Sequence, residues 1–380
     1  MRQKKLLYIV RYRKDQSFNL KAKFDGQIKA FMNLGFDVSY VAFDTDNFYL
    51  INHNETETIG KTHFRFPAYL HTLFYVQLYM LALRLVKSRD YDCVYWRYSP
   101  GWFSGYRFAK FAHSHNTKIL YEYPTYPPTE ENSMGKLRRI FLKYSAIWQK
   151  KINKVVDIFV LIGEDAGGSY NGKPAVNISN GIDLDVIPQR NPKPDTDAVH
   201  LLALASMSYW HGYDRLIRSL AQYRGSQKVM IHMVGGNDGG CIPEWKALTE
   251  ELGLTDQVIF HGTKSGDALS QMFDLCDVGI NSLGMYRKGF SVTSELKTRE
   301  YAARGLPFVC SVDDPALEHA NVPMWLRVKN DDSIPNMEEI VSFALQMRED
   351  AQAVVKLREY AKQHLTWESQ YQMVFKVMNL

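Results

Sequence analysis

The sequence predicts an α/β protein built from two Rossmann-like, doubly wound domains. Its 380 residues are too many for one ordinary core and fit two domains of about 190 residues each. Short apolar segments alternate with segments of helical length, which is typical of parallel sheets covered on both faces. This alternation stops at a proline-rich segment, residues 188–194, and then starts again.

The first half is expected to contain five short strands rich in Val, Ile, Tyr and Phe. They lie at 6–10, 37–43, 92–97, 118–122 and 157–162. Helices are expected between them, at 26–34, 68–87, 101–113 and 134–155. This succession of strand and helix predicts a domain at 1–188.

The second half repeats the pattern. Strands are expected at 199–205, 228–234, 257–260, 278–281 and 307–310. Helices are expected at 213–223, 243–252, 267–274 and 295–304, and residues from about 349 to 380 also look helical. This part predicts a second domain at 189–362.

Composition and charge exclude several classes of protein. With 46% apolar and 23% charged residues, the chain is neither disordered nor fibrous. Four scattered cysteines exclude a disulfide scaffold and a zinc ribbon, and favour a reducing compartment. The apolar run at 6–10 is too short for a signal peptide or a membrane span, so we expect a cytoplasmic protein. Residues 1–188 carry 26 Lys and Arg against 17 Asp and Glu, which indicates an anionic partner for that half.

Residues 291–307 form the most informative segment. Thr293 and Ser294 are suitable N-caps for the helix expected at 295–304. The start of this helix would lie at the carboxyl edge of the sheet, where its N–H groups and Lys297 favour an anion. Glu300, one turn further on, is placed to accept two ribose hydroxyls. An ordinary amphipathic helix with a Glu–Lys surface pair explains the same pattern equally well.

Several motifs resemble those of retaining glycosyltransferases of family four. Residues 300–307 resemble the second half of the family's Glu-x7-Glu motif, followed by small residues, Gly and Pro. Further segments agree in order and spacing: 180–183, 210–212, 234–236, 260–262 and 365–368, with 23–27 and 122–128 resembling bacterial surface-polysaccharide members. The resemblance covers nearly the whole chain.

This resemblance implies the GT-B fold, with two Rossmann-like domains facing a cleft and a terminal helix, 363–380, that crosses back to the first domain. It implies an enzyme that moves a hexose from a nucleotide diphosphate sugar to a hydroxyl of a lipid-linked or saccharide acceptor. The anomeric configuration would be retained, and UDP is favoured by the habit of the family. The role would be surface polysaccharide biosynthesis.

The resemblance also implies roles for individual residues. Lys297, His211 and Glu295 are the expected catalytic residues. The donor would be bound by the second domain, through Glu300, Lys297, Ser294, Thr293, Gly212, Gly235, Gly236 and Gly262. The acceptor would be bound by the first domain, through Glu122, at the carboxyl end of a strand, and Tyr126. No protein nucleophile is expected, because the acceptor hydroxyl attacks the sugar.

Three positions depart from the family pattern. The first motif glutamate falls at Val292, and the usual arginine and lysine of the second domain's first loop align with Ser206 and His211. We expect Glu295 to replace the glutamate, and Lys297 with a protonated His211 to replace the cations. The same departures motivate an alternative from another class, a catalytically silent GT-B subunit that supports another transferase. A nucleotide-sugar epimerase is a third and weaker reading.

No metal or other cofactor is expected. Asp44 and Asp46 have the spacing of a manganese site, but an exposed acidic turn explains them better. Residues 134–155 combine an apolar stripe with a basic rim, which suits either the inner membrane surface or an internal packing helix. Nucleic acid is not expected as a partner, because no recognition motif is present.

Overall fold

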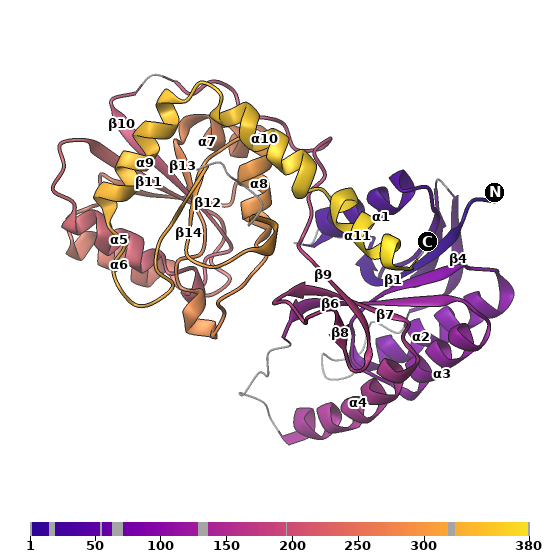
Figure 1. Cartoon of the computed structure of the whole chain (residues 1–380). Helices are drawn as coiled ribbons and strands as arrows, with labels where there is room; N and C mark the ends of the chain where they lie inside the picture. The colour runs from indigo at the N-terminus through magenta and orange to yellow at the C-terminus, as the bar shows by residue number, and fades with distance from the viewer. Residues whose placement is uncertain are drawn as a thin grey trace. The chain divides into compact units, whose positions relative to one another are not determined.

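The computed structural model describes residues 2–14, 20–53, 55–62, 71–127, 136–194, 196–317 and 324–378, leaving aside the side chains of 71–72 and 136–140. Its contacts divide the chain into two compact units (Figure 1). Unit 1 comprises Met1–Ile178 and Trp367–Leu380, and unit 2 comprises Ser179–Thr366. Each unit is built around a sheet whose strands are mostly parallel, so the α/β fold with two domains is confirmed.

Unit 1 contains a nine-stranded sheet. Its strands lie in the order β4 (Glu55–Lys61), β3 (Asn47–Asn52), β2 (Asp37–Phe43), β1 (Lys5–Arg13), β5 (Cys93–Arg97), β6 (Lys118–Tyr126), β7 (Ile158–Gly163), β9 (Lys173–Ile178) and β8 (Ser169–Tyr170). The predicted strands are the parallel centre. The antiparallel strands β3, β4 and β8 and the parallel strand β9 were not predicted.

Helices cover both faces of this sheet. One face packs against α2 (His71–Ser88), α3 (Phe103–Ser114) and α4 (Lys136–Val155), and the other against α1 (Lys21–Asn33) and α11 (Trp367–Met378). Side chains alternate along a strand, so Leu7 and Ile9 of β1 enter the first core, whereas Leu6, Tyr8 and Val10 enter the second.

Unit 2 contains a six-stranded, fully parallel sheet. Its strands lie in the order β12 (Val258–Gly262), β11 (Lys228–Val234), β10 (Ala198–Leu204), β13 (Val278–Ile280), β14 (Phe308–Cys310) and β15 (Trp325–Arg327). Numbered along the chain this order is 3-2-1-4-5-6, that of Rossmann folds, with the switch point between β10 and β13. Ligands of open α/β sheets bind beyond the carboxyl ends of the strands at this point.

Unit 2 carries six α-helices and three short 3-10 helices among its described residues. The α-helices are α5 (Tyr213–Gln222), α6 (Ile242–Glu251), α7 (Gly266–Leu275), α8 (Leu296–Arg304), α9 (Met337–Glu349) and α10 (Ala353–His364). The 3-10 helices are η2 (Tyr209–His211), η3 (Met285–Lys288) and η4 (Pro315–Leu317). The helical segment expected from about 349 thus consists of two helices, α10 and α11. The sequence did not predict α9 or β15.

The chain passes between the units ten residues before the expected boundary at 188. The proline-rich segment already belongs to unit 2, because Arg190 donates a backbone hydrogen bond to the Arg304 carbonyl (2.9 Å) and Asn191 donates one to Asp274 (2.7 Å). The return to unit 1 comes at Trp367 rather than at 363. In Figure 1, α11 lies beside α1, as expected of a terminal helix that packs on the first domain.

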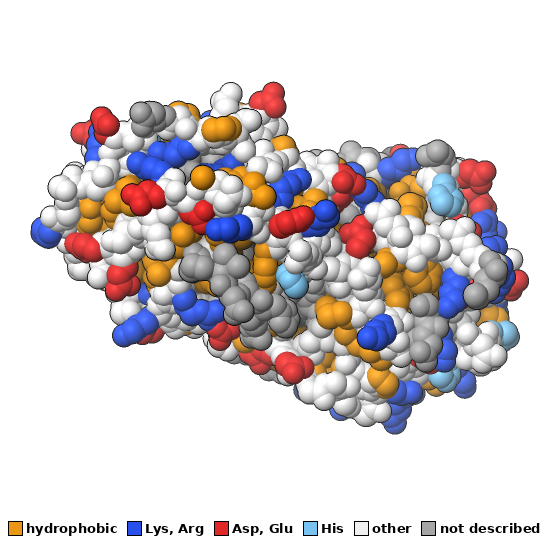
Figure 2. Space-filling view, turned by 45° about the horizontal axis from the view of Figure 1, so that its top comes forward, with side chains coloured by type: hydrophobic (Ala, Val, Ile, Leu, Met, Phe, Trp, Pro, Cys, Tyr) orange, Lys and Arg blue, Asp and Glu red, His pale blue; other side chains and the backbone are white. Residues whose placement is uncertain are grey.

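One face of the molecule carries side chains of both charges (Figure 2). The excess of Lys and Arg in residues 1–188 does not form one basic face in the view of Figure 2, where acidic and basic side chains are interspersed with hydrophobic ones. Among the described residues, no helix is long and apolar enough to cross a membrane.

Candidate functional site

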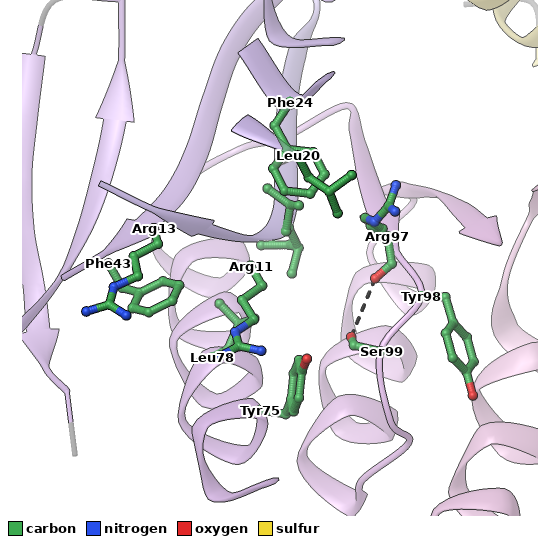
Figure 3. Close-up of a pocket in the computed structure, with 12 residues that line it drawn as sticks. Arg11, Arg13, Leu20, Phe24, Phe43, Tyr75, Leu78, Arg97, Tyr98 and Ser99 are labelled. Atoms are coloured by element: carbon green, nitrogen blue, oxygen red, sulfur yellow. Dashed lines mark hydrogen bonds between the residues drawn. The ribbon is translucent and has the colours of Figure 1, made fainter. Parts of the chain in front are cut away.

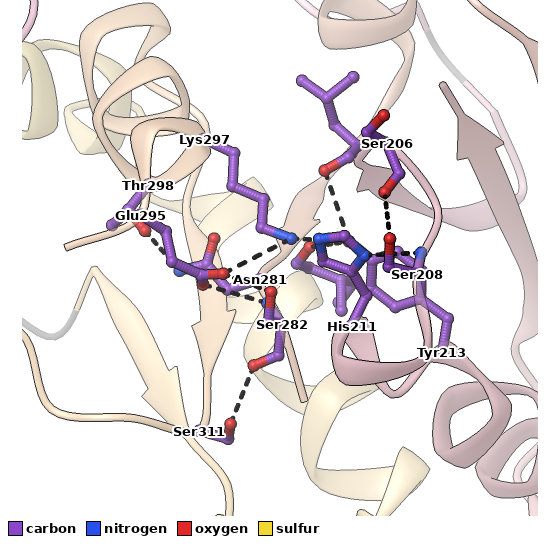
Figure 4. A network of polar contacts seen from close by, with 12 residues as sticks. Ser206, Ser208, His211, Tyr213, Asn281, Ser282, Glu295, Lys297, Thr298 and Ser311 are labelled. Atoms are coloured by element: carbon purple, nitrogen blue, oxygen red, sulfur yellow. Dashed lines mark hydrogen bonds and ion pairs between the residues drawn. The ribbon is translucent and has the colours of Figure 1, made fainter. Parts of the chain in front are cut away.

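The carboxyl edge of the unit 2 sheet brings predicted residues together at the switch point. The loop after β10 leads to η2, which ends at His211, and the loop after β13 leads to η3 and then to α8, whose first turn carries Lys297. Because β10 and β13 are neighbours, these segments meet in one network of polar contacts (Figure 4). The network includes three predicted residues, His211, Glu295 and Lys297.

Glu295 is anchored to the end of β13. Its carboxylate accepts a hydrogen bond from the Ser282 backbone N–H (3.2 Å) and another from the Ser282 hydroxyl. Glu295 is itself the N-cap residue of α8, so the prediction that Thr293 or Ser294 caps this helix is wrong. Among the described residues, no side chain caps the first turn of α8. Its N–H groups and dipole therefore favour an anion there.

Lys297 carries a buried positive charge beside this helix end. Its side chain is 11% exposed, and its ammonium donates a hydrogen bond to the Tyr213 hydroxyl (3.1 Å). Burial lowers the pKa of Lys297, and the Glu295 carboxylate, 3.9 Å away, partly offsets that effect. The Tyr213 hydroxyl in turn donates to the backbone carbonyl of Ile280 (3.1 Å). Tyr213 thus fixes the ammonium relative to the sheet.

His211 is neutral in this structure. Burial, followed by the charge of Lys297, lowers its pKa to about 2. Burial and the charge of Lys297 thus both favour the neutral ring, whereas a protonated His211 was expected beside a bound diphosphate, so that expectation stays a prediction. The Ser208 backbone N–H donates to Nδ1 (3.0 Å), so the ring proton resides on Nε2. His211 can donate this N–H to an anion without becoming charged.

Glu300 pairs with Arg304 and not with Lys297, the partner that the sequence suggested. Its carboxylate accepts a hydrogen bond from Arg304 Nε (3.1 Å), one turn further along α8. The Glu300 side chain is 22% exposed, so its carboxylate remains accessible to a ligand. No contact between Glu300 and Lys297 is found in the described structure.

Thr293 and Ser294 fasten neighbouring segments. The Ser294 hydroxyl oxygen accepts from the Asn180 backbone N–H (2.6 Å), and the Ser294 carbonyl accepts from the Asn180 side chain (2.5 Å). The Thr293 backbone N–H donates to the Asp313 carbonyl (2.9 Å). These contacts fasten the Ser294 hydroxyl oxygen and carbonyl to Asn180, whereas the buried Thr293 hydroxyl has no hydrogen-bond partner among the described residues.

The four predicted glycines line the ends of β10, β11 and β12. Gly235 has φ +139°, and a Cβ there would lie 1.7 Å from the Ala205 carbonyl oxygen. Gly212 has φ +64°, and its Cβ would lie 2.5 Å from the Gly284 nitrogen. At Gly236 and Gly262 a Cβ would have more room. Close packing of loops therefore explains Gly212 and Gly235 without a ligand.

The residues expected to bind the acceptor lie in unit 1. Glu122 was expected at the end of a strand, but β6 continues to Tyr126, and the Glu122 side chain is fully buried. It accepts hydrogen bonds from Tyr95 (2.7 Å) and Gln27 (2.9 Å) and pairs with Arg97. Its carboxylate is thus part of the core and is not open to an acceptor.

The Glu122 carboxylate is kept ionised by its neighbours. Burial alone would raise the pKa of Glu122, but the charges of Arg97 and Lys23 outweigh burial and hold the pKa below its usual value. Tyr126, at the end of β6, is half-buried and packs its ring against Tyr170, with centroids 5.3 Å apart.

Asp44 and Asp46 form a turn between β2 and β3. The Asp44 carboxylate accepts from the backbone N–H groups of Asp46 (2.8 Å) and Asn47 (2.7 Å) and from the Tyr49 hydroxyl (2.6 Å). Within the described ranges, no group of three or more His, Cys, Asp or Glu side chains is arranged to hold a metal ion.

Sequence reasoning missed two parts of the network in unit 2. Tyr213 directly follows the Trp210-His211-Gly212 motif, Asn281 ends the strand expected at 278–281 and Ser282 follows it, so their positions were a usable signal. Asn281 donates to the Thr298 hydroxyl (2.8 Å), while its buried Oδ1 has no partner among the described residues.

Comparison with protein families finds a match in this part of the chain. Residues 185–325 match the family model described as glycosyl transferases group 1. The matched segment contains the loops after β10 and β13 and the whole of α8. No curated protein matches the chain significantly.

Solved structures resemble the chain over its whole length. Sucrose-phosphate synthase from Thermosynechococcus elongatus has a TM-score of 0.68 at 15% identity, covering 99% of this chain and 98% of its own. HepE from Anabaena, in complex with UDP, has a TM-score of 0.60 at 14% identity, covering 99% of each chain. WaaG, a glycosyltransferase involved in lipopolysaccharide biosynthesis, has a TM-score of 0.58 at 14% identity, covering 99% of this chain and 100% of its own.

These likenesses establish the fold, which is the GT-B fold expected from the motifs. Together with the match to the group 1 family model, they support a transferase enzyme.

Proposed function

We propose that the protein is a retaining glycosyltransferase that moves a hexose from a UDP-sugar to a hydroxyl of a lipid-linked or saccharide acceptor in surface polysaccharide assembly. Unit 2 binds the donor and unit 1 the acceptor. The observation that carries the proposal is the position of Lys297. It places a buried ammonium beside the uncapped end of α8, at the switch point of unit 2, in the segment that matches the group 1 family model.

The reaction needs stabilisation of the leaving diphosphate as the anomeric carbon becomes cationic. The α8 N-terminus, the Lys297 ammonium and the His211 Nε2–H supply three preorganised donors for that charge. Glu295 holds Lys297 at the edge of the sheet, and Glu300 binds the ribose hydroxyls. These groups act without a metal ion, and the acceptor hydroxyl is the nucleophile.

The proposed donor nucleotide and biological role rest on structural similarity to HepE and WaaG. HepE was solved with UDP, and WaaG is involved in lipopolysaccharide biosynthesis. The first supports a uridine nucleotide and the second a surface-glycan acceptor for a chain of the same fold. The bacterial surface-polysaccharide motifs at 23–27 and 122–128 point in the same direction.

We place the protein in the cytoplasm, with α4 at the membrane surface. The described part of α4 exposes Leu142, Tyr144 and Ile147, which are 41%, 38% and 56% exposed, and the exposed Lys143, Lys150, Lys151 and Lys154 lie among them. A helix surface that mixes exposed apolar and basic side chains suits an anionic lipid surface. Ile152 of the same helix is buried, so α4 also serves as a packing helix.

Donor turnover, measured by mass spectrometry, tests the proposal. The full-length protein is incubated with UDP-, GDP- and dTDP-sugars, with and without membrane lipid extract. Lys297→Ala and Glu300→Ala are compared with Lys228→Ala, which makes the same substitution at the exposed amino end of β11. We expect release of UDP that increases with lipid, is abolished by Lys297→Ala, and is unchanged in Lys228→Ala.

Two other outcomes would contradict the transferase proposal. UDP binding without turnover, in the presence of every acceptor fraction, would favour a silent subunit, to which the departures at Val292 and Ser206 also point. Isomerised donor without nucleotide release would favour an epimerase. Loss of two ribose hydrogen bonds in Glu300→Ala should weaken UDP binding by about 1–3 kcal/mol, so unchanged affinity would exclude that role for Glu300.

A further inference from the structure

Unit 1 contains a pocket of 390 Å³ that none of the predicted site residues lines. It lies at the carboxyl ends of β1 and β5. The sheet continues from β1 through β2 in one direction and from β5 through β6 in the other, so this is the switch point of unit 1. The pocket therefore occupies the place where open α/β sheets bind ligands.

Two arginines reach the pocket from β1. The same face of β1 carries Leu7 and Ile9, which are buried against the helices, and then Arg11 and Arg13. The apolar face of the strand thus ends in two guanidinium groups. Figure 3 shows Arg11 extending toward Tyr75, between Arg13 on one side and Arg97 on the other.

The third arginine is held in place by the core. Arg97, at the end of β5, pairs with the fully buried Glu122 and lies 5.2 Å from the centre of the Phe24 ring. The Lys23 ammonium is 3.8 Å from the same carboxylate, so one negative charge faces two positive ones. None of the described residues that line the pocket is acidic. Among the described lining residues, the charged groups are therefore the three guanidinium groups.

The remaining lining is apolar and aromatic. It consists of Ile9, Val10, Leu20, Phe24, Phe43, Tyr75, Leu78 and Tyr98, with Ser99. Tyr98 is 39% exposed and stacks on Tyr123, with ring centroids 4.8 Å apart. Such a surface suits a hydrocarbon chain or the apolar face of a sugar ring, attached to the group that the arginines bind.

We propose that this pocket binds a phosphate or diphosphate group of the acceptor through Arg11, Arg13 and Arg97. Guanidinium forks bind phosphate oxygens with paired, charge-assisted hydrogen bonds, and three of them match a multiply charged anion better than a neutral sugar. Glu122 is then a positioning residue for Arg97 and does not touch the acceptor. The anion site rests on the arginines alone, whereas its assignment to the acceptor rests on the proposed function.

Titration calorimetry on the full-length protein, with UDP present in saturating amount, tests this proposal. The probes are inorganic pyrophosphate, farnesyl diphosphate and glucose 1-phosphate. The double variant Arg11→Gln/Arg13→Gln removes two guanidinium groups without disturbing the Arg97–Glu122 pair. The control Arg107→Gln/Lys110→Gln makes the same change in charge at exposed positions of α3, outside the pocket.

We expect pyrophosphate to bind at least tenfold more weakly to Arg11→Gln/Arg13→Gln than to the wild type, and equally well to the control. Tenfold tighter binding of farnesyl diphosphate than of pyrophosphate would identify a lipid as the carrier of the phosphate. Tenfold tighter binding of glucose 1-phosphate would identify a phosphorylated sugar. Failure of every probe to bind, or affinities within twofold in both double variants, would overturn the anion site.

UDP binding distinguishes a failure of the proposed glycosyltransferase function from a failure of the anion site. UDP binding should be lost in Lys297→Ala and kept in Arg11→Gln/Arg13→Gln. Without UDP binding or donor turnover, but with arginine-dependent binding of pyrophosphate, the anion site would stand and its role in acceptor binding would fall.

Discussion

At the residue scale, the Glu122 carboxylate is the charge on which the core of unit 1 depends. It is fully buried and faces the positive charges of Arg97 and Lys23. Removing one partner of a buried ion pair costs about 3–5 kcal/mol, because the remaining charge is left without compensation. We therefore expect Glu122→Gln to lower the free energy of unfolding of unit 1 by about that amount in chemical denaturation.

The matched control for Glu122→Gln is Glu57→Gln, which breaks an exposed pair with Arg89 and should cost about 0–1 kcal/mol. The pKa of Glu122 is lowered in the folded state, so its contribution is present above the unfolded pKa of about 4.3. This stabilising contribution is lost as the pH falls through the pKa of Glu122 in the folded state. Equal costs for both variants at pH 7 would contradict the role given to Glu122.

His211 makes the stability of unit 2 depend on pH. Its pKa is about 2 when folded, against about 6.5 when unfolded. Between these values only the unfolded state binds the proton, so stability falls as pH decreases below 6.5. For this residue alone the loss between pH 8 and pH 5 is about 2 kcal/mol.

Urea denaturation of His211→Gln from pH 5 to pH 8 measures this dependence. Gln keeps an acceptor for the Ser208 N–H, and the difference in stability from the wild type should change by about 2 kcal/mol over that range. A constant difference for His211→Gln would show that folding does not lower the pKa of His211.

At the element scale, the turn after β11 depends on Gly235. Alanine would have to adopt φ +139° with its Cβ 1.7 Å from the Ala205 carbonyl oxygen. Overpacking and backbone strain should together cost about 3 kcal/mol or more. Gly262→Ala is the matched control, because φ is +68° but no atom lies within 4 Å of the added Cβ. It should cost about 1–2 kcal/mol.

Thermal unfolding, followed by circular dichroism, compares the two glycine variants. We expect Gly235→Ala to unfold at a clearly lower temperature than Gly262→Ala. If Gly262→Ala also lost donor binding while Gly235→Ala kept it, the glycines would act through the ligand and not through loop packing.

The same scale shows which elements the sequence could predict. The central strands are continuous apolar runs, because a parallel sheet is buried on both faces. The edge strand β4 has the sequence ETETIGK and is mostly exposed, so only its pairing with β3 makes it a strand. The N-cap of α8 was misplaced for a similar reason, since Ser294 binds Asn180, which is distant in the chain.

The candidate site could also be predicted only in part from the sequence. Lys297 and His211 were predictable because they lie on motifs at strand ends. The tautomer and charge of His211 were not, because they depend on burial and on Lys297 from another element. The arginines at positions 11 and 13 follow the strand expected at 6–10, and their neighbour Arg97 comes from β5, which only the sheet order places beside them.

At the scale of the whole molecule, the last helix completes a core that the first residues begin. In α11, Tyr371 and Phe375 are buried against Phe31 of α1, and the Tyr371 hydroxyl accepts a hydrogen bond from Gln27 (2.6 Å). Unit 1 therefore lacks part of one face until residue 375 has been made. Its folding depends on both ends of the chain, whereas unit 2 is formed by the continuous segment between them.

This dependence predicts that Tyr371→Ala/Phe375→Ala destabilises unit 1 and leaves unit 2 unchanged. Each truncation should cost about 3–5 kcal/mol, because a buried aromatic ring is replaced by a cavity. The control Met373→Ala/Val377→Ala changes the same helix at positions that are 44% and 55% exposed, and should have little effect. Hydrogen exchange read by mass spectrometry locates the effect: we expect faster exchange in β1, β5 and α1, and unchanged exchange in β10 and β13. Equal acceleration in both units would show that they unfold as one cooperative body, and that α11 does not stabilise unit 1 alone.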